Sequence, residues 1–184
     1  MELKDRGHAL EGAFFRDLNQ QLIEKMNAKA EREQTLAELS NATGIQDQAA
    51  LGRLADSGVT AGTLAALVCV PLIHVAWADN SLDAGEKEAV IKAAQEAGVA
   101  DGTPAAQLLM SWLDKGRDEG LFANWTGYIA ALKPHLSPDQ FIAMRDKVIG
   151  NCHAVAQASG GIFGFGTESG TEKHAIRAVR AAFK

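Results

Sequence analysis

The sequence contains very little cysteine, and neither cysteine stands in a disulfide or metal-ligand pattern. Cys69 and Cys152 are the only two among 184 residues, and they lie 83 residues apart. Two isolated thiols supply neither a disulfide framework nor the paired Cys-x-x-Cys ligands of a zinc site. The first residues, MELKDRGHAL, also lack the apolar stretch of a secretion signal. We therefore expect a cytoplasmic protein in a reducing compartment.

The chain also lacks an excess of basic residues. It carries 18 Lys and Arg against 23 Asp and Glu, a formal net charge of −5 at pH 7. That balance argues against a chain built to neutralise nucleic-acid phosphates or an anionic membrane surface. Hydrophobic residues make up 47% of the chain, so it has enough apolar material to fold. We expect a folded protein without a nucleic-acid partner.

One stretch without charged residues has the length of a membrane span. It covers residues 58–78, GVTAGTLAALVCVPLIHVAWA, and about 20 apolar residues cross a bilayer as a helix. Pro71, His74 and several small residues dilute its hydrophobicity, and no cluster of basic residues flanks it. We therefore expect a central buried helix without stable membrane insertion.

Alternation of apolar and polar residues, the pattern of a paired strand, does not persist anywhere. Helical spacing and helix-capping residues recur instead, with caps predicted at Thr60, Asp83, Thr103 and Ser137. The sequence therefore predicts an all-α fold, in which one helix runs from Thr60 to Ala78.

The first part of the chain predicts one long amphipathic helix, or two helices in line. Residues 4–41 contain no proline, and apolar residues recur at helical spacing at Phe15, Leu18, Leu22 and Met26. Charged and amide side chains occupy the positions between them. A glycine stop follows this helix.

A weak internal repeat relates two later segments. Residues 74–87 read HVAWADNSLDAGEK, and residues 153–173 contain a comparable sequence interrupted by an insertion. Each consists of an apolar helix, a polar turn, one apolar residue and a D/S-x-x-E capping box. We predict two helix–turn–helix hairpins that pack as halves of one core.

The string VAWADNSLDAGEKE at residues 75–88 resembles the signature of the tellurite-resistance TerB-like family, and the resemblance covers about residues 60–183. It implies a compact bundle of about seven helices over residues 59–184, preceded by a helical arm over residues 1–58. It also implies a non-enzymatic stress-response or scaffold module. The sequence departs from the family pattern at Asn80, where glycine is usual, and at Ser159, where a second aspartate is usual.

The acidic turn in this string is the candidate metal site. Asp79, Asp83 and Glu86 offer carboxylate oxygens, the ligands that calcium, magnesium and manganese prefer. An EF-hand loop counted from Asp79 would need glycine at its sixth position and glutamate at its twelfth, but Ala84 and Val90 stand there. The interpretation we favour is that Asp83 and Glu86 form only a capping box, with a bound divalent cation as the alternative.

A second resemblance concerns the N-terminal helix. Residues 5–14 match D-R-x-x-A-x-E-x-x-F, through Asp5, Arg6, Ala9, Glu11 and Phe14. This pattern is similar to the zeta-type inhibitor of rotary ATP synthases over about residues 5–60. It implies the alternative function, a regulatory protein that binds a partner such as an ATPase through its N-terminal helix. An exposed apolar stripe on this helix would favour that function, whereas burial against the bundle would favour the scaffold.

The sequence shows no motif of catalysis. It has neither a nucleophile elbow nor H-E-x-x-H, and His74, Cys152 and His153 lack the spacing of a zinc site. We interpret these as a buried, hydrogen-bonded histidine and inert core thiols, and expect neither enzymatic activity nor a cofactor-binding or catalytic residue. The Gly- and Phe-rich segment 159–170 suits a hydrophobic plug better than a phosphate-binding loop.

Overall fold

The computed structural model describes residues 3–158 and 168–184, with side chains from residue 20 onward within these ranges. The described residues form eight α-helices and two 3-10 helices, and they contain no strand. This confirms the predicted all-α class. The helices are α1 (Leu3–Thr43), α2 (Gln48–Asp56), η1 (Ala61–Cys69), α3 (Val70–Ala76), α4 (Ala84–Glu96), α5 (Pro104–Lys115), α6 (Glu119–Leu132), η2 (Lys133–His135), α7 (Pro138–Ala158) and α8 (Gly170–Ala181).

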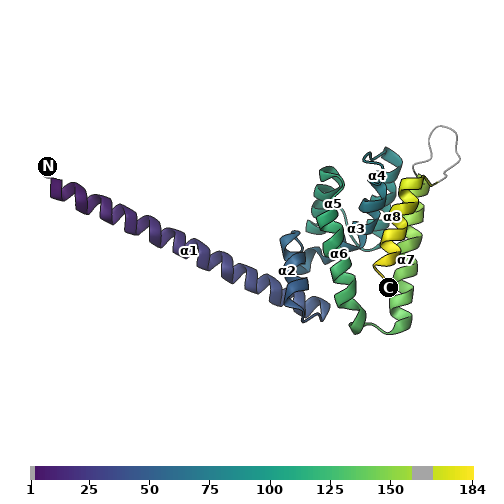
Figure 1. Ribbon diagram of the computed structural model, residues 1–184, viewed down its shortest axis with the longest axis horizontal. Coiled ribbons are helices and arrows are strands. Elements are labelled where there is room, and N and C mark those ends of the chain that lie inside the picture. The colour runs from purple at the N-terminus through teal and green to yellow at the C-terminus, as the bar shows by residue number, and fades with distance from the viewer. Residues whose placement is uncertain (1–2, 159–167) are drawn as a thin grey trace.

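Helix α3 lies at the centre of a bundle, and α1 projects away from that bundle as a single long helix (Figure 1). Every residue of α3 is buried, and the helix packs against α4, α6, α7 and α8. All its residues except His74 are apolar, and a helix that is apolar on nearly all sides needs such complete cover. At the N-terminus the structure has one long helix, α1, and only the last turns of α1 meet the bundle (Figure 1).

The end of α1 and all of α2 belong to the same hydrophobic core as the rest of the bundle. Leu39, Ile45, Leu51 and Leu54 are each at most 1% exposed, and they pack within one cluster with residues of α3 to α8. Gly44, with φ of 75°, lets the chain turn between the two helices, because this left-handed region favours glycine. The boundary at residue 58 stays a prediction.

The single helix predicted from Thr60 to Ala78 is wrong in its geometry. The segment forms η1 up to Cys69 and the shorter α3 from Val70 to Ala76. Pro71 stands in the first turn of α3, where its missing N–H needs no partner. Further along a continuous α-helix, its ring would clash with the carbonyl of Leu67. A proline in this position therefore starts a helix and interrupts any helix that precedes it.

Among the described residues, no single helix has both the length and the apolar composition needed to cross a membrane. Helix α2 and the segment from Ala61 to Ala76 meet that test only when taken together, and they are bent by 80° relative to each other.

The predicted capping residues occupy their expected positions. Thr103 Oγ1 accepts a hydrogen bond from the N–H of Ala106, and Ser137 and Gln140 bond reciprocally at the start of α7. These bonds satisfy backbone N–H groups that the first helical turn leaves without partners. Short-range sequence signals thus fix where the helices of the bundle begin.

Candidate functional site

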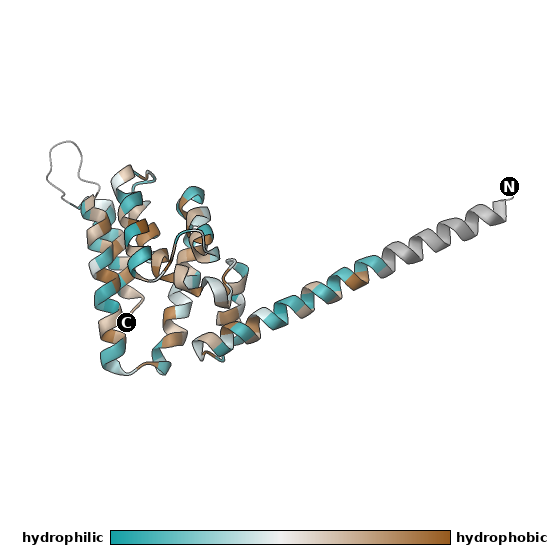
Figure 2. Ribbon diagram, turned by 180° about the vertical axis from the view of Figure 1, so that it is seen from behind, coloured by the Kyte–Doolittle hydropathy of each residue, from teal (hydrophilic) through white to brown (hydrophobic). Residues whose placement is uncertain are grey.

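The outer part of α1 exposes large apolar side chains. Leu22 is 55% exposed, Ile23 57% and Met26 63%. Figure 2 shows that hydrophobic and hydrophilic residues alternate along this part of the helix. Leucine, isoleucine and methionine are usually buried, and neighbouring exposed ones are typical of a binding surface. These three residues, which we call the α1 apolar face, are the strongest candidate for a functional site.

The base of α1 is fixed to the bundle by contacts at its last turns. Leu39 is fully buried, and Leu36 is half-buried against the core. Arg32 Nη1 donates to Asp56 Oδ1 of α2 at 2.6 Å. This bond raises the pKa of Arg32 and lowers the pKa of Asp56. Helix α1 is thus anchored from Arg32 onward, and the apolar face lies beyond that anchor.

Side-chain pairs one helical turn apart support the projecting part of α1. Gln20 donates to Glu24 at 3.1 Å, and Lys29 lies 3.8 Å from Glu33. Such pairs each stabilise a helix by about 0.2–0.5 kcal/mol. They help the helix persist in water where no tertiary contact covers it.

The structure describes two of the four residues of the predicted apolar stripe on α1, and it shows one further exposed apolar residue beside them. Leu22 and Met26 are exposed, whereas Phe15 and Leu18 lie outside the residues with described side chains. Asp5 to Phe14, which carry the resemblance to the ATP synthase inhibitor, lie outside them too. The sequence reasoning missed Ile23. Its spacing of three residues from Met26 is a helical spacing and could have identified it.

The acidic turn forms the predicted capping box. Asp83 Oδ1 accepts from the N–H of Glu86 at 2.8 Å, and Glu86 Oε2 accepts from the N–H of Asp83 at 3.0 Å. Asp79 Oδ1 accepts from both the N–H and the hydroxyl of Ser81, which lowers the pKa of Asp79. Asn80 has φ of 65°, a left-handed conformation that asparagine tolerates better than most residues other than glycine.

Within the described residues, no group of three or more His, Cys, Asp or Glu side chains is arranged to hold a metal ion. The structure therefore does not assemble Asp79, Asp83 and Glu86 into a ligand set. Asp83 and Glu86 already use one oxygen each in the capping box. A divalent cation at this turn stays a prediction.

The second predicted turn ends in an equivalent capping box at the start of α8. Ser169 Oγ accepts from the N–H of Glu172 at 3.2 Å, and Glu172 accepts in return from the N–H of Ser169. Glu86 and Glu172 are both 5% exposed, and the charge of Glu172 acts on Glu86. Of the predicted plug at residues 159–170, residues 159–167, which include Ser159, lie outside the described residues.

Glu86 is the buried carboxyl with the most perturbed titration. Burial raises its pKa to about 7, the hydrogen bond from the Asp83 N–H opposes that rise, and the charges of Asp83, Glu172 and Asp79 add to it. The pKa in the folded protein thus lies above the ordinary value of 4.5. The folded state therefore binds the proton more tightly than the unfolded state, and the stability contributed by protonation is lost as pH rises toward and through 7.

We expect Glu86→Gln to raise the melting temperature at pH 8 by a few degrees and to have much less effect at pH 5. Glutamine keeps the acceptor oxygen that the capping box needs but carries no charge to bury. Thermal unfolding of both proteins across this pH range measures the effect. Equal melting-temperature differences at the two pH values would show that Glu86 is not the titrating group.

The histidine and cysteines considered above are mostly core residues. Burial raises the pKa of Cys69 and Cys152 to about 12, so neither is a reactive thiolate at neutral pH. His74 is buried as expected, but the expected hydrogen bond is not found at Nδ1, which has no partner among the described residues. Its ring instead stacks on Phe122 with centroids 3.8 Å apart. His153 Nδ1 lies 2.5 Å from Glu168 Oε1.

Comparisons of the chain with protein-family models, with curated proteins and with solved structures found no match.

Proposed function

We propose that this protein is a non-enzymatic interaction protein that binds a partner protein through α1 and uses the helical bundle as an anchor. The observation that carries the proposal is the exposure of Leu22, Ile23 and Met26 on a helix that projects from the bundle (Figure 1). An exposed apolar face on this helix favours partner binding, whereas a face buried against the bundle would favour the scaffold function.

The spacing of the apolar face suits a groove on the partner. Met26 follows Leu22 by four residues and Ile23 by three, so the three side chains share one side of the helix. Helices that bind in apolar grooves present anchors at this spacing. We therefore infer that the partner is a protein with an apolar groove.

A second copy of this chain fits the α1 apolar face less well. In a coiled coil that has both Leu22 and Met26 in its core, at positions d and a, the next core positions are 29, 33 and 36. Lys29 and Glu33 occupy the first two of them. A parallel homodimer would therefore bring like charges together at two consecutive core positions.

A membrane surface fits less well too. Helices that lie on membranes carry an excess of basic residues on their polar side. Residues 20–35 contain three basic side chains, Lys25, Lys29 and Arg32, and three acidic ones, Glu24, Glu31 and Glu33. This balance gives no electrostatic attraction to anionic lipid.

The experiment that tests the proposal is photo-cross-linking in cells of the organism that makes the protein. A photoreactive amino acid at position 26 should give one discrete adduct with another protein. The same group at position 24, on the opposite side of the helix, should give little or none. Adducts of twice the chain's own mass would identify a second copy of this chain as the binding partner. Adducts with lipid would identify a membrane surface as the binding partner.

The TerB-like scaffold with a divalent cation is the second candidate, favoured by the burial of Glu86 and Glu172 close to Asp79. A cation present at a hundred times its Kd would add about 2.7 kcal/mol, or about 5–10 °C in melting temperature. Because capping occupies Asp83 and Glu86, we expect calcium, magnesium or manganese at millimolar concentration to give the same melting temperature as a chelator. A rise that disappears in Asp79→Ala would instead establish a metal-responsive module.

A further inference from the structure

A row of basic side chains borders the α1 apolar face. Lys25, Lys29 and Arg32 are separated by four and three residues, so they lie along one side of α1, and all three are exposed. We call these three residues the basic row. Lys25 follows Leu22 by three residues, which places it beside the apolar face, and Lys29 has the same spacing from Met26. The α1 apolar face therefore has one basic edge.

The other edge of the α1 apolar face carries amide side chains. Gln20 precedes Ile23 by three residues and Asn27 follows it by four, so these amides border the face on the side away from the basic row. Glu24 and Glu31 are seven residues apart and share the remaining side of the helix. A groove that holds the apolar face therefore meets basic side chains along one of its two edges and amides along the other.

The inner end of the basic row already binds a carboxylate. Arg32 Nη1 donates to Asp56 Oδ1 at 2.6 Å, and Asp56 is the last residue of α2. The basic row therefore runs along the side of α1 that faces α2. Lys29 and Lys25 extend this row outward from that pair by about 5 and 11 Å along the helix axis.

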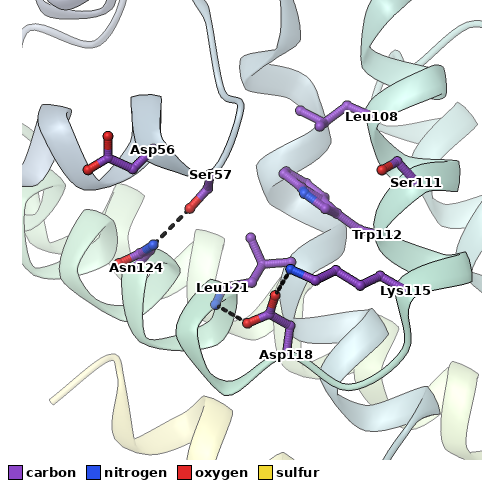
Figure 3. A pocket seen from close by; sticks show the side chains of 9 residues that line it. All are labelled: Asp56, Ser57, Leu108, Ser111, Trp112, Lys115, Asp118, Leu121 and Asn124. Atoms are coloured by element: carbon purple, nitrogen blue, oxygen red, sulfur yellow. Dashed lines mark hydrogen bonds and ion pairs between the residues drawn. The ribbon is translucent and has the colours of Figure 1, made fainter.

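A cleft of about 350 Å³ between α2, α5 and α6 adjoins this pair, and its charges are already matched (Figure 3). Asp56 and Trp112 are among its lining residues, and so are Lys115 and Asp118. Lys115 Nζ donates to Asp118 Oδ2 at 2.6 Å, while Asp56 bonds Arg32. The charged side chains of the cleft are thus paired, and they do not neutralise the outer part of the basic row.

The two lysines of the basic row are available to a partner. Lys25 makes no ion pair within the part of the chain whose side chains are described. Lys29 lies 3.8 Å from Glu33, and the two side chains are 77% and 66% exposed. An exposed pair of this kind contributes at most about 1 kcal/mol, so Lys29 can exchange Glu33 for a carboxylate of a partner at little cost.

We propose that the partner protein carries acidic side chains along one edge of its apolar groove, where they pair with Lys25 and Lys29. The acidic edge lies on the side of α1 that faces α2, in line with Asp56. It determines which way the helix runs in the groove, because a reversed helix would place the basic row against the other edge. This inference names the chemistry of the partner at the α1 apolar face and rests on the proposed function.

The test uses the full-length protein and, as the probe, the purified protein that position 26 captures. Lys25→Gln combined with Lys29→Gln should weaken binding about tenfold at about 50 mM salt, because two attractive charge pairs are lost. At about 500 mM salt the loss should shrink to about twofold, since salt screens exposed charges. Titration gives the Kd at each salt concentration. Glutamine keeps good helix propensity, so the melting temperature should stay within about 1–2 °C of the wild type.

A matched variant removes two charges from another side of the same helix. Glu24→Gln combined with Glu31→Gln should leave the Kd within about threefold of the wild type at both salt concentrations. Binding of the lysine variant that equals or exceeds wild-type binding at low salt would overturn the inference, because the groove would then have no acidic edge.

A carbodiimide locates the acidic edge directly, because it joins a lysine amine to a carboxylate. After treatment of the complex, mass spectrometry should find Lys25 or Lys29 linked to an aspartate or glutamate of the probe. Links confined to Glu33 of the same chain would contradict the pairing.

The results separate this inference from the proposed function. If position 26 captures no protein, or if the variant with Leu22, Ile23 and Met26 changed binds normally, the proposed function fails and this inference fails with it. If that variant loses binding while the lysine variant binds like the wild type, the apolar face is the binding site and only the acidic edge is wrong.

Discussion

Replacing Leu22, Ile23 and Met26 together with glutamine is expected to weaken binding of the partner protein by at least about 100-fold. The three side chains are the large exposed apolar residues of α1 in the part where side chains are described, so they are the anchors available to an apolar groove. Glutamine keeps good helix propensity, and the side chains it replaces are more than half exposed. The melting temperature should therefore stay within about 1–2 °C of the wild type. Titration of the cross-linked partner with each protein measures the Kd.

A matched variant on the opposite side of α1 controls for nonspecific effects. Glu24→Gln, Ala28→Gln and Glu31→Gln introduce three glutamines into the same stretch without touching the α1 apolar face. This variant should bind the partner within about threefold of the wild type. If both variants bind equally well, α1 does not contact its partner through the apolar face.

The second large effect concerns stability, where Trp125→Ala is expected to cost about 3–5 kcal/mol. Trp125 is 2% exposed and contacts the rings of Phe122 and Phe183, with centroids 5.6 and 5.8 Å away. It thereby joins α6 to the C-terminal end of the chain. Removing the indole leaves a cavity that the surrounding helices only partly fill, which lowers the melting temperature by about 10 °C. Denaturant unfolding gives the free energy directly.

A surface substitution provides the comparison for this measurement. Ile142 is 45% exposed on α7, so Ile142→Ala removes apolar atoms that are already largely in water. Its cost should stay below about 1 kcal/mol. A loss for Trp125→Ala no larger than that for Ile142→Ala would mean that Trp125 is not in the core.

The fold class was predictable because its signals are local. Capping residues such as Asp83, Thr103 and Ser137 stand within three residues of the N–H groups that they satisfy. Their patterns therefore give helix starts without knowledge of tertiary structure. Pro71 marks the break between η1 and α3, but the apolar run continues on both sides of it, so hydrophobicity alone predicts one unbroken helix.

The features of the candidate sites could not be predicted from the sequence, because they depend on contacts between distant parts of the chain. Apolar spacing in the N-terminal segment predicts an amphipathic helix, but only the folded arrangement shows that Leu22 and Met26 remain uncovered. The charge of Glu172 acts on Glu86 because α4, which begins beside Glu86, packs against α7, and α8, which begins beside Glu172, packs against α3 and α7. The cleft beside Trp112 needs three helices to form it. Periodicity along one segment carries no information on such neighbours.

Hydrogen exchange of the full-length protein, with and without the cross-linked partner, tests the central proposal most directly. Free α1 should exchange quickly between residues 20 and 30, because a helix without tertiary cover opens by local fraying. Binding through the α1 apolar face should slow exchange of these amides. Protection confined to the bundle, with exchange in α1 unchanged, would contradict the proposal that α1 is the binding element.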